Sequence, residues 1–429
     1  MKSILERDRN HVWHPFTQHG LNSVVLPVRS ARGAYLELEN GTRLLDAISS
    51  WWVNIHGHAE PRIAKAIADQ ASQLEHVIFA GFTHEPAVRL AETLITALQA
   101  RGTSLNRVFY TDNGSTAVEA ALKMSYQYHL NRLAGSSAPK RDRFLALKGA
   151  YHGDTLGAMS VSEPSGFHVK FKDLLVPVDF IEPDDLVQAT RQFELHGTKY
   201  AALILEPRIQ GAGGMRIHSA EYLCHLATLC RDSGTLLIVD EIFTGFHRTG
   251  PCFAFESARI RPDLICVSKG LTGGFLPLAA AITTEKVFEA FLSEVVDDAF
   301  LHGHSYTANP IACAAALASW EILQSPECQA RIQRLGEITA ERVLDLSLHT
   351  KATGARHLGT IGAVNARLMD LTYAAGSAGA GQKLRETAQK LGVLLRPLGP
   401  VLYTVPPYCL TDSELHQVYD AMSAALNSI

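Results

Sequence analysis

The stretch Thr235-Leu-Leu-Ile-Val-Asp240-Glu241 decides the fold, because it is a short apolar run that ends in two carboxylates. A second such run, Pro262-Asp-Leu-Ile-Cys-Val-Ser-Lys269, ends in a lysine. The apolar residues of both runs are continuous rather than alternating, which is typical of strands buried on both faces of a parallel sheet. Open α/β sheets bind ligands at the carboxyl ends of their strands. We therefore expect Asp240 and Lys269 to face one crevice from neighbouring strands.

An acid and an amine at such an edge have two interpretations. A lysine in a partly dry site loses its proton readily and can attack a carbonyl to form a Schiff base. An aspartate beside a pyridine nitrogen keeps that nitrogen protonated, and pyridoxal phosphate needs both partners. The alternative is an ordinary ion pair between Asp240 and Lys269, and these two residues alone do not decide between the two.

Three further apolar runs deliver polar residues in the same way. Gly114 and Ser115 follow the run 107–111 and precede a helical pattern over 116–128. A glycine permits a tight turn there, a serine can cap the helix, and the exposed N–H groups can bind an anion such as a phosphate. Tyr151 follows the run 143–148, and Glu206 follows the run 200–205. The five runs together predict one shared site.

The length of 429 residues allows two or three domains. The predicted fold class is α/β, with a mostly parallel central sheet, helices on both faces and a smaller α+β domain. Residues 51–310 are expected to form the large domain that binds the cofactor. Residues 311–429 are expected to form the small domain, together with the N-terminal segment 1–50.

Composition excludes several classes of function. The net charge of −4 gives no support for a nucleic-acid or membrane surface, and no apolar run reaches the roughly 18 residues of a membrane span. Seven cysteines without a CxxC pair, and a start without an apolar signal core, favour a cytoplasmic protein with reduced thiols. The pairs His56/His58 and His302/His304 supply only two ligands each, so we expect no metal site.

Aromatic and basic residues outside the sheet form a second group of candidates. Phe16 lies in an aromatic N-terminal segment that either anchors this arm or lines a pocket. Trp51 and Trp52 either pack in the core or, on a loop, turn into one cleft. Arg396 is either a clamp for a carboxylate, whose shape its guanidinium matches, or half of a surface ion pair.

The motif from Ile238 to Gly250, together with Lys269, the Gly114-Ser115 turn and the Tyr151-His-Gly sequence, resembles the class III (ω) aminotransferases. The resemblance covers nearly the whole chain and implies a fold-type I enzyme that depends on pyridoxal 5'-phosphate. It implies that Lys269 is the Schiff-base lysine and proton carrier and that Asp240 holds the pyridine nitrogen.

The resemblance also assigns the phosphate site. It implies that Gly114 and Ser115 bind the phosphate and that His304 and Ser305 reach it from a neighbouring subunit. The chain would then be a homodimer with active sites at the interface.

Other motifs resemble the branch of this family that transfers an amino group from S-adenosylmethionine to 8-amino-7-oxononanoate in biotin synthesis. They include Ser49–Trp52, Tyr151–Ser160 and Arg396–Gly399. The resemblance implies that Tyr151 covers the cofactor ring. It also implies a set of residues that contact substrate, with Arg396 on the oxononanoate carboxylate: Phe16, Trp51, Trp52, Tyr151, Gly303 and Arg396.

Two positions depart from the commonest pattern of that branch. Phe16 stands where a tyrosine is usual, and His304-Ser305-Tyr306 replaces a Pro-Thr-Phe loop. Both variants resemble a branch that uses lysine as amino donor. The alternatives are therefore the same reaction with lysine, another ω-aminotransferase acting on ornithine, γ-aminobutyrate or general ω-amino acids, or a non-catalytic regulator. The last usually carries a DNA-binding module, and this chain shows no added basic domain.

Overall fold

The computed structural model describes residues 2–21, 25–133, 140–163, 168–367 and 380–429. They form two compact units: a large unit, Pro61–Ser325, and a small unit, Met1–Glu60 with Pro326–Ile429. The sequence placed these boundaries after residues 50 and 310. The second boundary lies later in the chain than expected, because helix α10 (Pro310–Leu323) packs against α3 (Pro61–Ala71) and α4 (Glu85–Gln99). This packing keeps α10 in the large unit.

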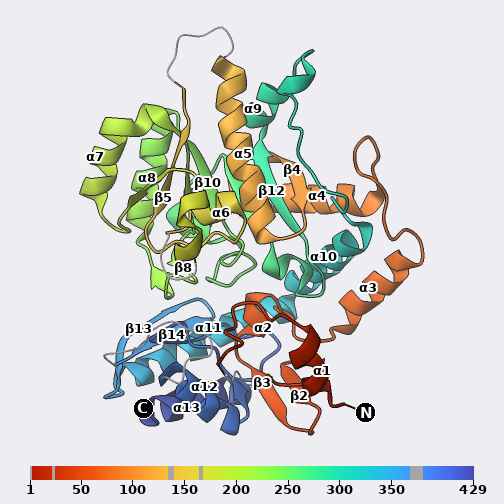
Figure 1. Ribbon diagram of the computed structural model, residues 1–429, viewed down its shortest axis with the longest axis vertical. Coiled ribbons are helices and arrows are strands. Elements are labelled where there is room, and N and C mark those ends of the chain that lie inside the picture. Colours follow the sequence, from red (N-terminus) through yellow and green to blue (C-terminus); the bar gives the residue numbers. More distant parts are fainter. Residues whose placement is uncertain (1, 22–24, 134–139, 164–167, 368–379) are drawn as a thin grey trace. The chain divides into compact units, whose positions relative to one another are not determined.

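A seven-stranded sheet forms the centre of the large unit (Figure 1), in the order β4-β12-β11-β10-β7-β5-β6. Strand β12 is antiparallel to both of its neighbours, so the other six strands run in one direction. The predicted α/β class with a mostly parallel sheet is confirmed. The strands are β4 (Leu105–Thr111), β5 (Arg143–Leu147), β6 (Val178–Ile181), β7 (Tyr200–Leu205), β10 (Leu236–Asp240), β11 (Leu264–Val267) and β12 (Ala279–Thr284).

Both faces of this sheet are buried, which explains the continuous apolar runs. Every residue of β7, β10, β11 and β12 is buried. Helix α5 (Gly114–Leu133) packs across β12, β11, β10 and β7, and its small residues let it approach closely. Other elements of this unit include α6 (Leu156–Ser160), α7 (Leu186–His196), α8 (Ala220–Ser233), α9 (Glu285–Phe288) and the hairpin of β8 (Ile209–Gln210) with β9 (Arg216–Ile217).

In the described part of the small unit there are two small sheets and five α-helices. One sheet has the order β1-β2-β3-β15 and the other β13-β14-β16. Strands β2 and β3 form an antiparallel hairpin, and Gly41 in the turn between them has a φ of +81°. The strands are β1 (Val28–Arg32), β2 (Tyr35–Leu38), β3 (Arg43–Asp46), β13 (Ala352–Leu358), β14 (Ile361–Ala366), β15 (Val393–Leu394) and β16 (Val401–Thr404). The helices are α1 (Ile4–His11), α2 (Ser49–Trp52), α11 (Pro326–Ser347), α12 (Ala380–Lys390) and α13 (Asp412–Asn427).

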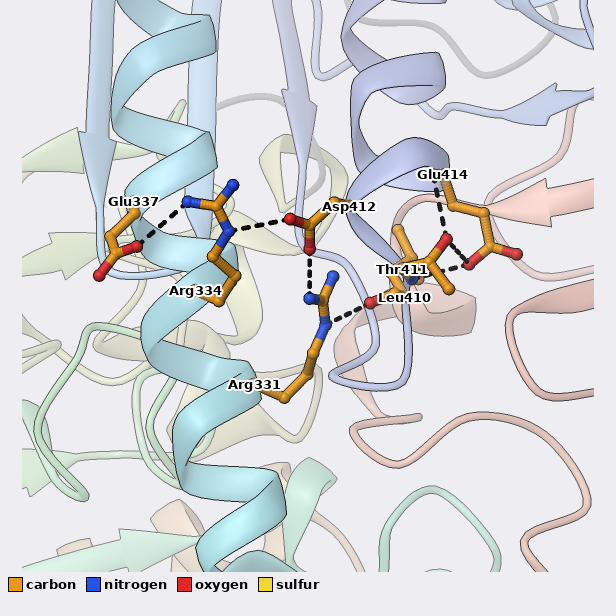
Figure 2. Close-up of polar contacts among 7 residues, drawn as sticks. All are labelled: Arg331, Arg334, Glu337, Leu410, Thr411, Asp412 and Glu414. Atoms are coloured by element: carbon orange, nitrogen blue, oxygen red, sulfur yellow. Dashed lines mark hydrogen bonds and ion pairs between the residues drawn. The ribbon is translucent and has the colours of Figure 1, made fainter.

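Charged groups fix the start of α13 against α11 (Figure 2). Asp412 pairs with both Arg331 and Arg334, the latter at 2.9 Å, and Arg331 Nε also donates to the Leu410 carbonyl at 2.5 Å. Thr411 and Glu414 form a reciprocal capping box at the same helix end. These pairs are partly exposed, so they orient the helix more than they stabilise it.

The described part of the chain shows neither a membrane-spanning helix nor a cluster of metal ligands. No helix there is long and apolar enough to cross a membrane. No group of three or more histidine, cysteine or acidic side chains there is arranged so that it could hold a metal ion. All seven cysteines lie in the described residues, and four of them are buried.

Close packing around Gly362 of β14 gives a prediction about stability. A Cβ atom there would lie 2.2 Å from Tyr419 Oη and 3.0 Å from the Val343 side chain. Gly362→Ala is therefore expected to lower the free energy of unfolding by about 1–3 kcal/mol through overpacking. Thermal unfolding measures this loss. Gly381→Ala is the control, because its Cβ would meet no atom within 4 Å; an equal loss in the control would contradict the packing argument.

Candidate active site at the carboxyl ends of the strands

The sheet brings the predicted polar residues to one edge. Asp240 is the last residue of β10, and Lys269 follows the end of β11, its parallel neighbour, in which Cys266 lies opposite Asp240. Glu206 directly follows β7, and Tyr151 lies in the segment after β5. These strands and β4 share one direction, so their carboxyl ends lie at the same edge of the sheet.

Asp240 is held by two donors. Its Oδ1 accepts a hydrogen bond from the backbone N–H of Ile242 at 3.0 Å, and its Oδ2 lies 2.7 Å from His152 Nδ1. Asp240 is 4% exposed and the His152 side chain is fully buried. A carboxylate only accepts, so His152 Nδ1 carries the proton. Sequence reasoning assigned no role to His152, although the Tyr151-His152-Gly153 motif contained the signal.

The ammonium group of Lys269 is disfavoured by its surroundings. Burial lowers the pKa of Lys269 to about 8, against the opposing charges of Asp240 and Glu206. Part of the residue is exposed, but the protein around Nζ still replaces most of its water; Nζ lies 5.5 Å from the centre of the Phe243 ring. The backbone is also strained, since Lys269 has a φ of +44°. Backbone strain and perturbed pKa values are each more frequent at functional sites than elsewhere.

Glu206 supports the segment that carries Tyr151. Its carboxylate accepts from the backbone N–H of Tyr151 at 3.2 Å and of Gly211 at 2.9 Å. Burial is the largest of the causes that raise the pKa of Glu206 to about 7, and the nearby charge of Asp240 adds to it. The backbone contact with Tyr151 indicates a structural role for this acid.

The Gly114-Ser115 turn differs from its predicted geometry in two respects. Gly114 does not have a positive φ; instead, a Cβ there would lie 2.9 Å from the Ile242 side chain, so the glycine permits close packing. Asn113 rather than Ser115 caps α5, because its Oδ1 accepts from the Thr116 N–H at 3.1 Å. The Ser115 hydroxyl instead accepts from the Asp154 N–H at 3.0 Å.

The amino end of α5 remains open to an anion. Among the described residues, the backbone N–H groups of Gly114 and Ser115 donate to no group, as is usual in a first helical turn. Gly153, at a φ of +133°, approaches so closely that a Cβ would lie 2.2 Å from Ser115 Oγ. The N–H groups of Gly114 and Ser115 are therefore available to an anion. The close packing beside them requires glycine at positions 114 and 153.

Three of the predicted substrate residues contact one another in the small unit. The Arg396 guanidinium lies 4.5 Å from the centre of the Trp51 ring, and Phe16 meets Trp51 edge-on at 5.3 Å. The charge of Arg396 is the second cause, after burial, that lowers the pKa of Arg385. Two guanidinium groups near each other create a positive field that favours a carboxylate.

Trp52 lies apart from this group. It is 4% exposed and packs edge-on against Tyr403 at 6.1 Å. The four residues Ser49–Trp52 all have positive φ values, so the backbone turns sharply and the two indoles separate. The predicted alternative of core packing therefore describes the surroundings of Trp52, whereas Trp51 is half-buried beside Arg396.

The loop that carries Gly303, His304 and Ser305 lies elsewhere in the large unit. Gly303 and Ser305 are exposed, and His304 Nδ1 accepts from the Tyr306 N–H at 3.2 Å. Within the described residues, the hydrogen bonds and ring contacts of this loop do not join it to the strand-end residues. They run instead to neighbours such as Lys123 and His76.

The sequence matches the family model for class-III aminotransferases over residues 16–426. The chain belongs to the class III aminotransferase family. A relative from Synechococcus elongatus, named adenosylmethionine-8-amino-7-oxononanoate aminotransferase, is 48% identical and covers 98% of this chain and 99% of its own length. A Corynebacterium glutamicum protein of the same name is 38% identical, with 99% and 98% covered.

Solved structures of aminotransferases share the fold. The adenosylmethionine-8-amino-7-oxononanoate aminotransferase of Methanocaldococcus jannaschii matches with a TM-score of 0.90 and 33% identity, covering 99% of this chain and 98% of that one. An amine transaminase from an uncultivated Pseudomonas species, solved with pyridoxal phosphate bound, matches with a TM-score of 0.88 and 29% identity, covering 97% and 98%. The family depends on pyridoxal phosphate, and the strand-end residues fit this cofactor: a buried acid with a fixed partner, an amine of lowered pKa and free N–H donors.

The Lys269 pKa gives a prediction for the protein without cofactor. Only the neutral amine bonds to an aldehyde, so the rate of pyridoxal phosphate capture is expected to rise with pH and to level off above about 8. An ordinary lysine would let the rate rise towards 10.5. Stopped-flow absorbance across this pH range measures the profile. A continued rise beyond pH 9 would show that the site does not lower the pKa of the amine.

Proposed function

We propose that this chain transfers the amino group of S-adenosylmethionine to 8-amino-7-oxononanoate, giving 7,8-diaminononanoate for biotin synthesis. The observation that carries the proposal is the 48% identity over 98% of the chain to a relative named for that reaction. The structure supports a transaminase because Asp240 and Lys269 end neighbouring parallel strands at the edge where such sheets bind ligands.

Lys269 has two tasks in this proposal. Its Nζ would hold the cofactor covalently. Once the amino donor has displaced it, the free amine would move a proton from the α-carbon of the donor to the cofactor, and in the second half of the reaction from the cofactor to the acceptor carbon. When bound, pyridoxal phosphate supplies an electron-accepting ring that stabilises the carbanion. A pKa of about 8 leaves a much larger neutral fraction of Lys269 near neutral pH than an ordinary lysine has.

The other strand-end residues orient the cofactor. The Asp240 carboxylate would hold the pyridine nitrogen in its protonated state, and His152 keeps that carboxylate in place. The N–H groups of Gly114 and Ser115, with the Ser115 hydroxyl, would bind the phosphate at the amino end of α5. Tyr151 would cover the ring.

The proposal assigns substrate contacts to Phe16, Trp51, Trp52, Gly303 and Arg396. Arg396 would bind the carboxylate of the oxononanoate, with its guanidinium oriented by the Trp51 ring. Phe16 and Trp52 would shape the space beside Trp51, and Gly303 would let substrate approach the backbone. Phe16 has no hydroxyl group that could contact the amino donor. The same reaction with lysine as the amino donor is therefore the second candidate.

Assembly and location belong to the proposal as well. We infer a cytoplasmic homodimer in which His304 and Ser305 contact the phosphate of the partner subunit's site. Their position on a loop with an exposed Gly303 and Ser305 is compatible with contact to a second copy. Sedimentation of the protein with cofactor bound tests the dimer.

Removing the amine of Lys269 tests the central assignment. Lys269→Ala is expected to lower turnover of S-adenosylmethionine and 8-amino-7-oxononanoate by roughly 10²–10⁴-fold or more. The variant should also lack the yellow absorbance band of the bound cofactor. Lys286→Ala is the control, because Lys286 lies on the short helix α9 directly after the antiparallel strand β12, at the opposite edge of the sheet from Lys269. Near-normal turnover in Lys269→Ala would refute the assignment.

A donor titration separates the two candidate reactions. S-adenosylmethionine, but not lysine, is expected to bleach the yellow band of the protein with cofactor bound, since the relatives are named for that donor. Bleaching by lysine alone would place the protein with the lysine-using enzymes. A response to ornithine or γ-aminobutyrate alone would indicate a different ω-aminotransferase.

A further inference from the structure

Asp154 forms hydrogen bonds with three residues: Tyr151, His168 and Ser115. Its Oδ2 accepts a hydrogen bond from the Tyr151 hydroxyl at 2.8 Å, and its Oδ1 lies 3.1 Å from His168 Nε2. Its backbone N–H donates to the Ser115 hydroxyl. The carboxylate therefore joins Tyr151 to His168, and the same residue joins both to the predicted phosphate site.

His168 is more deeply buried than an ordinary surface histidine. It is 2% exposed, although it pairs with an Asp154 side chain that is 49% exposed. Its ring stacks on the Tyr151 ring, with centroids 5.7 Å apart and planes inclined by 17°. One histidine thus contacts both partners of the tyrosine–carboxylate hydrogen bond.

The direction of these hydrogen bonds follows from the charge of Asp154. The hydrogen bond from His168 is the largest cause that lowers the pKa of Asp154, and the bond from Tyr151 also lowers it. An ionised carboxylate can only accept, so both His168 Nε2–H and Tyr151 O–H donate to it. A half-exposed carboxylate with one donor can rotate into water, whereas a second, buried donor fixes both oxygens.

We propose that His168 is a positioning residue for Tyr151, because it fixes the Asp154 carboxylate that receives the tyrosine hydroxyl and stacks on the tyrosine ring. The inference rests on the proposed function, in which Tyr151 covers the cofactor ring and contacts substrate. His168 itself touches neither cofactor nor substrate. It acts through Asp154 and through the face of the Tyr151 ring.

Two substitutions separate the hydrogen bond from the packing. His168→Gln keeps an amide N–H near the position of Nε2 but removes the aromatic ring. His168→Phe keeps a ring against Tyr151 but removes the donor to Asp154. The proposal expects His168→Phe to lower kcat/KM about tenfold, with the loss mainly in kcat, because the donor to a charged acceptor is gone. His168→Gln should stay within about threefold of the unaltered protein, because a donor to Asp154 remains.

A double-substitution cycle shows whether His168 acts through Tyr151. In a Tyr151→Phe background the hydroxyl that Asp154 holds is absent, so adding His168→Phe should change kcat/KM less than about twofold. A structural role of His168 would instead give two independent losses. A full additional loss of about tenfold in the double variant would overturn the proposal.

Cofactor affinity provides a readout besides activity. Titration of pyridoxal phosphate into the cofactor-free protein, followed by absorbance, should give a dissociation constant about fivefold higher or more for His168→Phe than for His168→Gln. Equal affinities together with equal kcat/KM for the two variants would overturn the proposal. His225→Phe is the control: His225 bonds only Thr190 among the described residues and should leave both quantities unchanged.

The melting temperature of each variant and the activity of the unaltered protein with each amino donor are measured in the same series. If His168→Phe lowers the melting temperature, His168→Met tests the same loss of donor with a flexible side chain, and the same expectation applies. Failure of the unaltered protein to use either amino donor would count against the proposed function. The affinity comparison would still test the role of His168 in that case.

Discussion

The buried carboxylate of Asp240 is the constraint on which the strand-end site depends. A charge at this depth is costly unless donors surround it, and here the Ile242 N–H and the His152 ring supply them. The Ile242 N–H is available because β10 ends at this point and its backbone turns away. His152 is available because the segment after β5 passes over the end of β10. The ligand-binding edge of the sheet is thus built around one buried acid and around the strand ends that supply its two hydrogen-bond donors.

Backbone strain gathers at the residues that the site needs. Lys269 has a positive φ at the end of β11, and Ser49–Trp52 form a run of positive φ values in the small unit. Each such residue costs about 1–3 kcal/mol, and the surrounding packing must hold it. In return, a short segment directs the Trp51 ring towards Arg396 and Phe16 while Trp52 enters the core.

Local patterns predicted most of the fold. Continuous apolar runs predicted strands that are buried in a mostly parallel sheet, and the structure places them there. The domain boundaries were harder to place, because a helix that packs on α3 and α4 has the same sequence pattern as one that begins a new domain. The cap of α5 was misassigned to Ser115 since Asn113 and Ser115 are both good capping residues and the sequence does not show which one turns inward.

The sequence by itself determined which residues end the strands, because the order of side chains along the chain places a particular polar residue directly after each apolar run. It determined the family as well, through motifs such as Ile238–Gly250. Only the tertiary structure decided which side chains face one another. The bonds of His152 to Asp240 and of His168 to Asp154 join residues on separate segments, and their geometry depends on the packing of those segments. Hydrogen bonds of this kind act over about 3 Å, a scale that the sequence pattern does not specify.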